Sequence, residues 1–461
     1  MRALRDVERL LDAYLNFEKL PQKNMFWLDT MSFLCERFGN PQGAFRSIHI
    51  AGSKGKGSVA AMIQGILAAL GFKAGLYTSP HVSDFSERIS LGNAPFAESV
   101  YRAAFRELAA GLGKITPADL PGGREITWFE GVTLYAFLTF RAARCEWAVL
   151  ETGLGGRLDA TNVASPEAAV ITVIEREHTE FLGNTLAEIA GEKAGIIKGD
   201  TPVVLAAQEG EALGVFRERA AERRAPLLYA PDLCSWECSE GPLGAEIRLA
   251  SPLFARPVSA RLRMHGAFQG ENAALAALAV KTALPQAGED AIEQGLASAF
   301  LPARFQVIER PQGFPHIPAL VVDGAHTPRS VSHTINTFRA VFPGKGAALL
   351  FACAQDKEAE EIARVFSAQA GLFSPVTLTV PGAVKKADPD RLCAAFSGAG
   401  VSFTFDGDYG RAVTGALLRA DEARSPLLVT GSFYLAGEVL KALQARGRTL
   451  PRPGGCGIVG P

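Results

Sequence analysis

Short apolar runs rich in β-branched residues alternate with longer segments of helical periodicity along most of the chain. Buried parallel strands are typically continuous apolar runs separated by amphipathic helices, so this alternation predicts doubly wound α/β domains with mainly parallel sheets. The expected strands are "SIHIA" (47–51), "WAVLE" (147–151), "AAVITVI" (168–174), "TPVVLAA" (201–207), "ALVVDG" (319–324), "AALLFA" (347–352), "VTLTV" (376–380), "VSFTF" (401–405) and "PLLVTGS" (426–432).

Two stretches interrupt this alternation. Residues 230–263 are rich in turn-forming and polar residues, which predicts a small antiparallel insertion. Near residue 300, "AFLPARFQVIERPQGF" ends a helical run with two prolines and starts a new unit. We therefore expect a first α/β domain over residues 1–300 and a Rossmann-like α/β domain over residues 301–461.

The N-terminal segment "MRALRDVERLLDAYLNF" predicts an amphipathic helix, with Leu4, Val7, Leu10, Leu11 and Leu15 on one face. It has no apolar h-region and no cleavage pattern, so it is not a signal peptide. No run approaches the roughly 18 apolar residues of a membrane span. These features predict a soluble, cytoplasmic protein.

Charge and cysteine usage narrow the possible partners. The chain has 47 Lys and Arg against 48 Asp and Glu, a formal net charge of −1. No global basic field therefore attracts nucleic acid or an acidic membrane, and neither is expected as a partner. The seven cysteines are odd in number and dispersed, as is typical of reduced thiols in the cytosol.

The segment "HIAGSKGKGS" (49–58) lies between an expected strand and a strongly periodic helix that ends at Gly71. A glycine-rich turn at a helix N-terminus directs backbone N–H groups at one point, which favours a phosphate. Lys56 adds a charge for the β/γ-phosphates, and Ser58 offers a hydroxyl to Mg²⁺ one residue later than in the usual P-loop. The alternative is a glycine-rich turn with two solvated lysines. The nucleotide-binding candidates here are Gly52, Ser53, Gly55, Lys56, Gly57 and Ser58.

Two candidate metal ligands follow other strands. Glu151 ends "WAVLE", at the strand tip where open α/β sheets bind ligands, and an acid there commonly holds the Mg²⁺ of a nucleotide. The alternative is a carboxylate that caps the next turn. His178 follows "AAVITVI", and the alternative for this histidine is a structural role.

Lys193 lies on the apolar face of a predicted helix, four residues after Ile189 and seven after Leu186. Thr185 and Glu188 have capping-box spacing at the start of that helix. Burying an unpaired ammonium is costly, so an inward lysine needs a partner or a chemical change. Spacing alone favours snorkelling or a salt bridge as the explanation.

The second domain supplies three further candidates. Asp323 and His326 come just past the expected strand "ALVVDG". Arg304 lies at the predicted domain junction, and its guanidinium suits the charge of a phosphate.

Taken together, these stretches resemble the folylpolyglutamate synthase/dihydrofolate synthase family, within the Mur-ligase-type ATP-dependent amide ligases. The resemblance runs from about residue 20 to about residue 445, and its motifs occur in the order of the family. They are "AGSKGKGSVA", "GLYTSPHVSDFSERIS", "TWFEGVTLYAF", "ETGLGGRLDATN", "HTEFLGNTLAEIAGEKAGIIK", "FQGENAALA", "DGAHTP", "QDKEAEEI" and "TGSFYLAGEV". The "YTSPH" and "GGRLDATN" pair distinguishes this family from cell-wall ligases of the same fold.

The resemblance implies an ATP-binding first domain and assigns roles to individual residues. Lys56 matches the lysine on the β/γ-phosphates, and Lys193 matches a lysine that is carbamylated in this family and helps to bind a second Mg²⁺. The other implied contacts are Ser58, Glu151 and His178 for Mg²⁺, Asn272 and Arg304 for ATP, Asp323 and His326 for ATP from the C-terminal domain, and Ser79, Pro80, His81, Phe129, Glu130 and Asp159 for the pterin substrate.

Five positions depart from the family pattern. They are Lys54 for an Asn, Glu177 for an Asp, Phe268 for a His, Ala303 for a Gly and Thr327 for an Asn. None removes an implied metal ligand or the P-loop lysine, so a working ATP ligase is expected. The departures bear instead on the affinities for adenine and substrate.

The resemblance implies a ligase that adds L-glutamate to a folate-type carboxylate through an acyl phosphate. Lys56, Lys193, Arg304 and His326 are the expected catalytic residues, with His326 as a candidate base for the incoming ammonium. The acceptor is dihydropteroate, tetrahydrofolate or both, and the wording of "GLGGRLDATN" favours both. A Mur-type ligase with another acceptor and a catalytically inactive nucleotide-binding regulator are the alternatives. Members of this family are usually monomers, so a monomer is expected.

Overall fold

The computed structural model describes residues 1–16, 27–241, 243–369, 371–382 and 385–446 of the chain. These form two compact units, which are described separately below. The first unit comprises Met1–Ser239, Leu243–Arg263 and Phe268–Leu301. The second comprises the chain from Pro302 onward, together with Glu240–Pro242 and Met264–Ala267.

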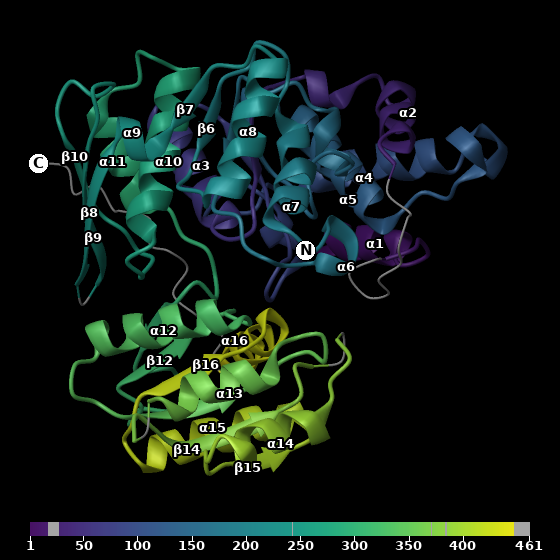
Figure 1. The fold of residues 1–461 in the computed structure, drawn as a ribbon. Coiled ribbons are helices and arrows are strands. Elements are labelled where there is room, and N and C mark those ends of the chain that lie inside the picture. The colour runs from purple at the N-terminus through teal and green to yellow at the C-terminus, as the bar shows by residue number, and fades with distance from the viewer. Residues whose placement is uncertain (17–26, 242, 370, 383–384, 447–461) are drawn as a thin grey trace, which may run out of the picture. The chain divides into compact units, whose positions relative to one another are not determined.

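The first unit contains a seven-stranded sheet of order β3-β2-β4-β1-β5-β6-β7, of which Figure 1 labels β6 and β7. All neighbouring strands are parallel except β3, which pairs antiparallel with β2. Strand β1 pairs with both β4 and β5, so the loops after these three strands emerge together at one edge of the sheet. The strands are β1 (Arg46–Ala51), β2 (Ala74–Tyr77), β3 (Ile89–Ser90), β4 (Trp147–Glu151), β5 (Ala168–Ile171), β6 (Val203–Leu205) and β7 (Leu227–Tyr229).

Helices cover both faces of this sheet. Helices α3 and α10 pack on one face, while α5, α7 and α8 pack on the side chains that alternate to the other. The described α-helices of the unit are α1 (Arg2–Leu11), α2 (Asp29–Arg37), α3 (Lys56–Ala69), α4 (Glu98–Leu112), α5 (Trp128–Ala142), α6 (Thr179–Leu182), α7 (Leu186–Lys193), α8 (Gly210–Glu222), α9 (Ala230–Leu233), α10 (Gln269–Ala283) and α11 (Glu289–Ser298).

The predicted insertion is a separate three-stranded sheet of order β10-β9-β8. Strands β9 and β10 pair antiparallel, as the turn-rich sequence predicts. The strands are β8 (Ser235–Gly241), β9 (Gly244–Ala250) and β10 (Val258–Arg261).

The second unit contains a six-stranded sheet of order β11-β12-β16-β13-β14-β15, parallel except for β11 (Figure 1). Phe338, Phe351, Phe366 and Phe396 contribute to one core cluster between this sheet and its helices. The strands are β11 (Gln306–Glu309), β12 (Ala319–Val322), β13 (Ala347–Phe351), β14 (Phe373–Thr379), β15 (Thr404–Asp406) and β16 (Leu427–Thr430), and the helices are α12 (Pro328–Val341), α13 (Ala359–Ser367), α14 (Pro389–Gly398), α15 (Tyr409–Glu422) and α16 (Phe433–Arg446).

The predicted fold class is confirmed: each expected strand is present, and both units are α/β with mainly parallel sheets. The short strands β2, β3, β7 and β11 were not predicted. Strand β2 contains Gly75, which weakens a strand pattern, but a Cβ at this position would lie 2.5 Å from the Phe140 ring. The absent side chain thus makes room for a helix residue. Helix α1 ends at Leu11, before the predicted Leu15, and residue 17 lies outside the described part. None of the described helices is long and apolar enough to cross a membrane.

Candidate active site

The loop between β1 and α3 follows a path that requires glycine. Gly52 and Gly55 have φ angles of 147° and 89°, in the region that side chains disfavour. A Cβ at residue 52 would lie 1.8 Å from Thr172 Oγ1, and a Cβ at residue 55 would lie 2.5 Å from Asn272 Oδ1. The loop therefore packs directly against the residue that follows β5 and against α10, which brings the predicted ATP contact Asn272 beside the predicted phosphate loop.

Helix α3 presents its N-terminus at the end of this loop. Its N-cap, Gly55, makes no side-chain capping bond, so the first turn of amides is suited to bind an anion. The Lys56 Nζ atom donates to the carbonyl oxygens of Gly52 (3.0 Å) and Ser53 (3.5 Å). The lysine thus lies folded over its own loop, and Ser58 is buried in the first turn of the helix.

Lys193 is buried beside the same loop, so its side chain lies on the apolar face of α7 and does not snorkel to solvent. Its side chain is 2% exposed, and its Nζ atom donates to Gly52 O at 2.7 Å. Burial, reinforced by the Lys56 charge, lowers the pKa of Lys193 from 10.5 to about 7. The capping box of Thr185 and Glu188 is present at the start of α7 and fixes the helix that carries this lysine.

Two departures from the family pattern are partners of each other. Lys54 Nζ lies 2.8 Å from Glu177 Oε2, while Glu177 Oε1 lies 3.9 Å from Lys193 Nζ. Burial by itself raises the pKa of Glu177, but the charges of Lys54, Lys56 and Lys193 outweigh this and hold it far below its usual range. Glu177 is therefore the ionised counterion of three lysines, a role that the sequence analysis missed. Residues 54 and 177 both depart from the family pattern with residues of opposite charge, and this was the sequence signal that could have predicted their contact.

The Glu151 carboxylate lies at the tip of β4, against the phosphate loop. A Cβ at Gly57 would lie 3.5 Å from Glu151 Oε2, and this oxygen accepts a hydrogen bond from Ser79 N at 3.1 Å. Glu151 thus lies between the predicted phosphate loop and the start of the predicted pterin loop. The peptide bond between Ser79 and Pro80 in that loop is cis.

The rest of the predicted pterin site is held by tight local contacts. His81 Nδ1 accepts from Arg88 Nε at 2.7 Å, and arginine is only a donor, so the ring proton of a neutral His81 lies on Nε2. The Phe129 ring packs on Gly153, where a Cβ would lie 2.4 Å from the ring. Glu130 Oε2 accepts from the backbone and hydroxyl of Thr127, so in this structure the carboxylate serves the capping box of α5.

Asp159 is 6% exposed and has four hydrogen-bond donors. Its Oδ2 accepts from the amides of Gly153 (2.8 Å) and Leu154 (3.0 Å), and its Oδ1 accepts from the amide (3.0 Å) and hydroxyl (2.5 Å) of Thr161. Burial raises the pKa of Asp159, and these four donors oppose that rise by stabilising the carboxylate. The carboxylate thereby fixes the loop that follows β4.

His178 differs from the other predicted ligands of the first unit because it is exposed. It has a left-handed backbone (φ 51°), which is uncommon for a residue other than glycine, and it precedes the short helix α6. His178 is the sequence neighbour of Glu177, and a charge on His178 is among those that lower the pKa of Glu177.

The second unit holds Arg304, Asp323 and His326 in a dense set of contacts. Asp323 accepts from Phe305 N (2.8 Å), Ala325 N (3.0 Å) and Thr334 Oγ1 (2.7 Å). His326 Nδ1 lies 2.8 Å from Gly324 O, a carbonyl that only accepts, so Nδ1 carries a proton. The Arg304 guanidinium carbon lies 4.1 Å from the centroid of Phe433.

Three other departures have visible structural consequences. Ala303 has a φ of 53°, a left-handed conformation that explains why glycine is usual at this position. Thr327 caps α12 and accepts from Ser330 N, so it performs the capping that Asn also performs well. Phe268 is 43% exposed at the N-cap of α10.

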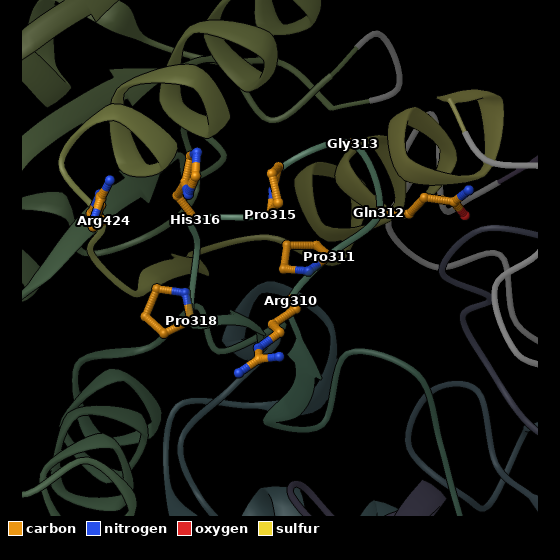
Figure 2. Close-up of a pocket in the computed structure, with 8 residues that line it drawn as sticks. All are labelled: Arg310, Pro311, Gln312, Gly313, Pro315, His316, Pro318 and Arg424. Carbon is orange, nitrogen blue, oxygen red and sulfur yellow. The ribbon is translucent and has the colours of Figure 1, made fainter.

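A cavity of about 550 Å³ in the second unit contains none of the predicted site residues. In Figure 2 the Arg310 side chain points away from the ring of His316, so the polar groups of its lining do not converge. The structure gives no reason to place the reaction there. The lining residues are Arg310, Pro311, Gln312, Gly313, Pro315, His316, Pro318 and Arg424.

Within the described residues, no three His, Cys, Asp or Glu side chains cluster as they would around a metal ion. The predicted magnesium ligands are instead a mixed set that includes the Ser58 hydroxyl and the Glu151 carboxylate. Such hard oxygen donors fit Mg²⁺, which usually keeps several waters and takes ligands from substrate phosphates.

The fold and the arrangement of Lys56, Lys193 and Glu151 around a glycine-rich loop define a nucleotide-dependent ligase of the Mur type. Family models agree: residues 50–280 match the Mur ligase middle domain, and residues 303–433 match the Mur ligase glutamate ligase domain.

Individual relatives narrow this class. The chain is 31% identical over 423 residues to the dihydrofolate synthase/folylpolyglutamate synthase of Bacillus subtilis, covering 90% of this chain and 95% of that one. The structure of Mycobacterium tuberculosis folylpolyglutamate synthase complexed with ADP and AMPPCP matches with a TM-score of 0.83 at 28% identity, over 96% of this chain and 98% of that one. Escherichia coli FolC in complex with DHPP and ADP matches with a TM-score of 0.79 at 26% identity, over 96% and 98%.

The chain belongs to the folylpolyglutamate synthase/dihydrofolate synthase family. It is accordingly an ATP-dependent ligase that joins an acid to an amino acid through an amide bond.

Proposed function

We propose that this ligase adds L-glutamate to both dihydropteroate and tetrahydrofolate, and so serves folate synthesis and polyglutamylation. The observation that carries the proposal is the convergence of Lys56 and Lys193 on one carbonyl, Gly52 O, beside the N-terminus of α3. The Lys56 ammonium and a helix N-terminus at one point suit the charge of ATP phosphates, and Lys193 lies beside them, where its carbamate would hold a metal ion. The double name of the Bacillus subtilis relative supports the two acceptors.

The first chemical step makes the carboxylate reactive. The acceptor carboxylate oxygen attacks the γ-phosphorus of ATP, the bond from this phosphorus to the bridging oxygen breaks, and ADP leaves. In this proposal Lys56 and the α3 amides bind the phosphates and offset the charge as it moves, because phosphoryl transfer is mainly positioning and charge neutralisation. The glutamate amine then attacks the acyl carbon of the acyl phosphate, loses a proton, and expels phosphate.

Lys193 is proposed to act as a carbamate. The neutral amine attacks the carbon of CO₂, a C–N bond forms, and a proton is released to solvent, which leaves a carboxylate on the lysine. The lowered pKa supports this because a large share of the amine is neutral near pH 7. Mg²⁺, when bound, neutralises phosphate charge; Ser58, Glu151 and His178 would hold one ion, and the carbamate a second.

The acceptor is proposed to bind at the loops that contain Ser79, Pro80, His81, Phe129 and Asp159. The Phe129 ring suits the flat face of a pterin, and Asp159, whose oxygens accept from four protein donors, fixes the loop that would hold it. From the second unit, Arg304, Asp323 and His326 are proposed to contact ATP, with His326 as a candidate base. We propose that residues 1–300 act as the ATP-binding domain, residues 301–461 as the second domain, and the protein as a cytoplasmic monomer.

The decisive experiment is glutamate-dependent phosphate release from Mg-ATP, run in parallel with dihydropteroate and with tetrahydrofolate. Release with both acceptors is the expected result. Release with tetrahydrofolate alone would limit the function to polyglutamylation of existing folate. No release with either, from folded protein that binds ATP, would contradict the folate assignment. Lys193→Ala should abolish release but keep ATP binding, whereas a protein that only binds nucleotide would change little.

A further inference from the structure

Three buried side chains connect strand β1 to the loop that follows β4. This loop contains Asp159 and is called the acceptor loop below. His49 on β1 is fully buried, and its Nε2 atom lies 2.8 Å from Thr161 Oγ1. Thr161, in the 3₁₀ helix Ala160–Val163, is also fully buried and donates its hydroxyl proton to Asp159 Oδ1 at 2.5 Å. Neither His49 nor Thr161 is among the expected ATP, metal or pterin contacts.

Proton counting fixes the direction of this chain of hydrogen bonds. Asp159 receives four donors and acts as a carboxylate, so the single hydroxyl proton of Thr161 points to Asp159. The Thr161 oxygen must then accept from His49, which requires the ring proton on Nε2. In this tautomer His49 Nδ1 is a buried acceptor, and within the described residues it has no hydrogen-bond partner.

The unpartnered Nδ1 atom lowers the stability of the fold, so packing alone does not explain a histidine at position 49. A buried polar atom without a partner destabilises the fold, whereas an apolar side chain of similar size would avoid that cost. The hydrogen bond from Nε2 is therefore the feature that distinguishes histidine from an apolar residue at this position. Its path leads through Thr161 to Asp159 and on to the amides of the loop after β4.

We propose that His49 is a positioning residue for the acceptor, because its Nε2–H orients the Thr161 hydroxyl and thereby holds Asp159 in place. His49 lies three residues before Gly52, so one strand supports both the phosphate loop and the acceptor loop. The inference rests on the proposed function only through the assignment of Asp159 to the acceptor. Thr161 is the intermediate of this relay and does not itself need to touch the substrate.

The test separates acceptor affinity from ATP affinity in two independent variants. His49→Phe removes the donor, and Thr161→Val interrupts the relay with a side chain of the same shape while leaving β1 unchanged. Each should raise the KM for dihydropteroate about tenfold or more, with the ATP Kd within about twofold of wild type. Thr161→Ser and His49→Gln, which keep a hydroxyl and an N–H donor, should restore most of the affinity. Ser47→Ala is the matched control, two residues away on the same side of β1.

A double variant, His49→Phe with Thr161→Val, shows whether both residues act through one chain. Its KM should be no higher than that of the worse single variant. Additive increases, or equal losses of acceptor and ATP affinity, would overturn the proposal in favour of general packing. Asp159→Ala distinguishes the two levels: if it leaves the acceptor KM unchanged, both the acceptor assignment and this inference fail. If it raises the KM while His49→Phe and Thr161→Val do not, only the inference fails.

Discussion

Two regions of the first unit differ in how their charges are balanced. The phosphate side is the loop from Gly52 to Ser58 with its neighbours Glu177 and Lys193, and the acceptor side is the loop after β4 that contains Asp159. On the phosphate side, Lys54 and Lys193 lie within 3.9 Å of one carboxylate, Glu177, the charge of Lys56 also acts on it, and Lys56 and Lys193 donate to the same carbonyl. On the acceptor side, the Asp159 carboxylate receives four donors. With Lys193 unmodified, the first region has more lysines than its shared carboxylate can neutralise, while the carboxylate of the second region is satisfied by protein donors.

This difference separates binding from positioning. Surplus charge in a partly buried loop is unfavourable until an anion arrives, so the phosphate side is suited to gain free energy when ATP binds. A carboxylate held by four donors gains little from new partners, but it fixes the shape of a loop. Mutations on the two sides should therefore fail in different kinetic parameters.

After the loss of release in Lys193→Ala, the largest effect is expected on the phosphate side, from Lys56→Ala. This change removes the charge that the proposed mechanism uses on the β/γ-phosphates, so kcat/KM should fall by about 10²–10³-fold. Steady-state phosphate release measures it, with Lys114→Ala at an exposed position of the same unit as the control. A loss of less than about tenfold would remove Lys56 from the mechanism.

On the acceptor side, Asp159→Asn should act on substrate affinity. Both oxygens of Asp159 accept from N–H groups, so either orientation of an Asn side chain directs its NH₂ at another donor. The loop must move, and we expect the acceptor KM to rise about 10–100-fold while the ATP Kd changes little. Titrations with dihydropteroate and with ATP check this, and exposed Asp232→Asn is the control. A comparable loss in ATP affinity would contradict the separation of the two sides.

The phosphate side was the more predictable of the two from sequence. Its loop is local: a strand, a glycine-rich turn and a helix follow one another between residues 46 and 69, and the helical spacing of Lys193 places it on the apolar face of its helix. The doubly wound fold was predictable for the same reason, since apolar periodicity reports each strand and helix separately.

The acceptor relay could not be predicted, because it joins residues distant in the chain. His49 and Thr161 are 112 positions apart, and no periodicity or spacing relates them before β1 and β4 pair in the sheet. Similarly, Glu130 has the capping spacing with Thr127, but only the structure shows that its carboxylate accepts from that cap. Side-chain chemistry that depends on strand order needs the fold first.

The buried His49 of the relay should make the free energy of unfolding depend on pH. Burial, and then the Lys198 charge, lower the pKa of His49 from 6.5 to about 3. Between these values the unfolded chain binds a proton that the folded chain does not, so the free energy of unfolding falls as the pH falls below 6.5. From about pH 6.5 to about pH 5 this group should cost the wild type about 1.6 kcal/mol, a loss absent in His49→Phe.

Urea unfolding of both proteins at the two pH values measures this difference. His316→Phe is a control, because that histidine is exposed and lies in the second unit. An equal loss of stability in wild type and His49→Phe would show that His49 gains no proton on unfolding in this range.

The smallest effect concerns the ion pair that joins the two departures on the phosphate side. Lys54 and Glu177 are 25% and 11% exposed, so their 2.8 Å contact is less screened than a surface pair. In a cycle of Lys54→Asn, Glu177→Asp and the double variant, we expect a coupling of about 1 kcal/mol in the free energy of unfolding. Arg46 and Glu167, also in contact but more than 40% exposed, form the control pair and should couple by less than about 0.5 kcal/mol. Equal coupling in both cycles would mean that Lys54 and Glu177 gain nothing from partial burial. The double variant should also retain a higher kcat/KM than either single variant. The reason is that Lys54→Asn alone leaves Glu177 without its nearest counterion.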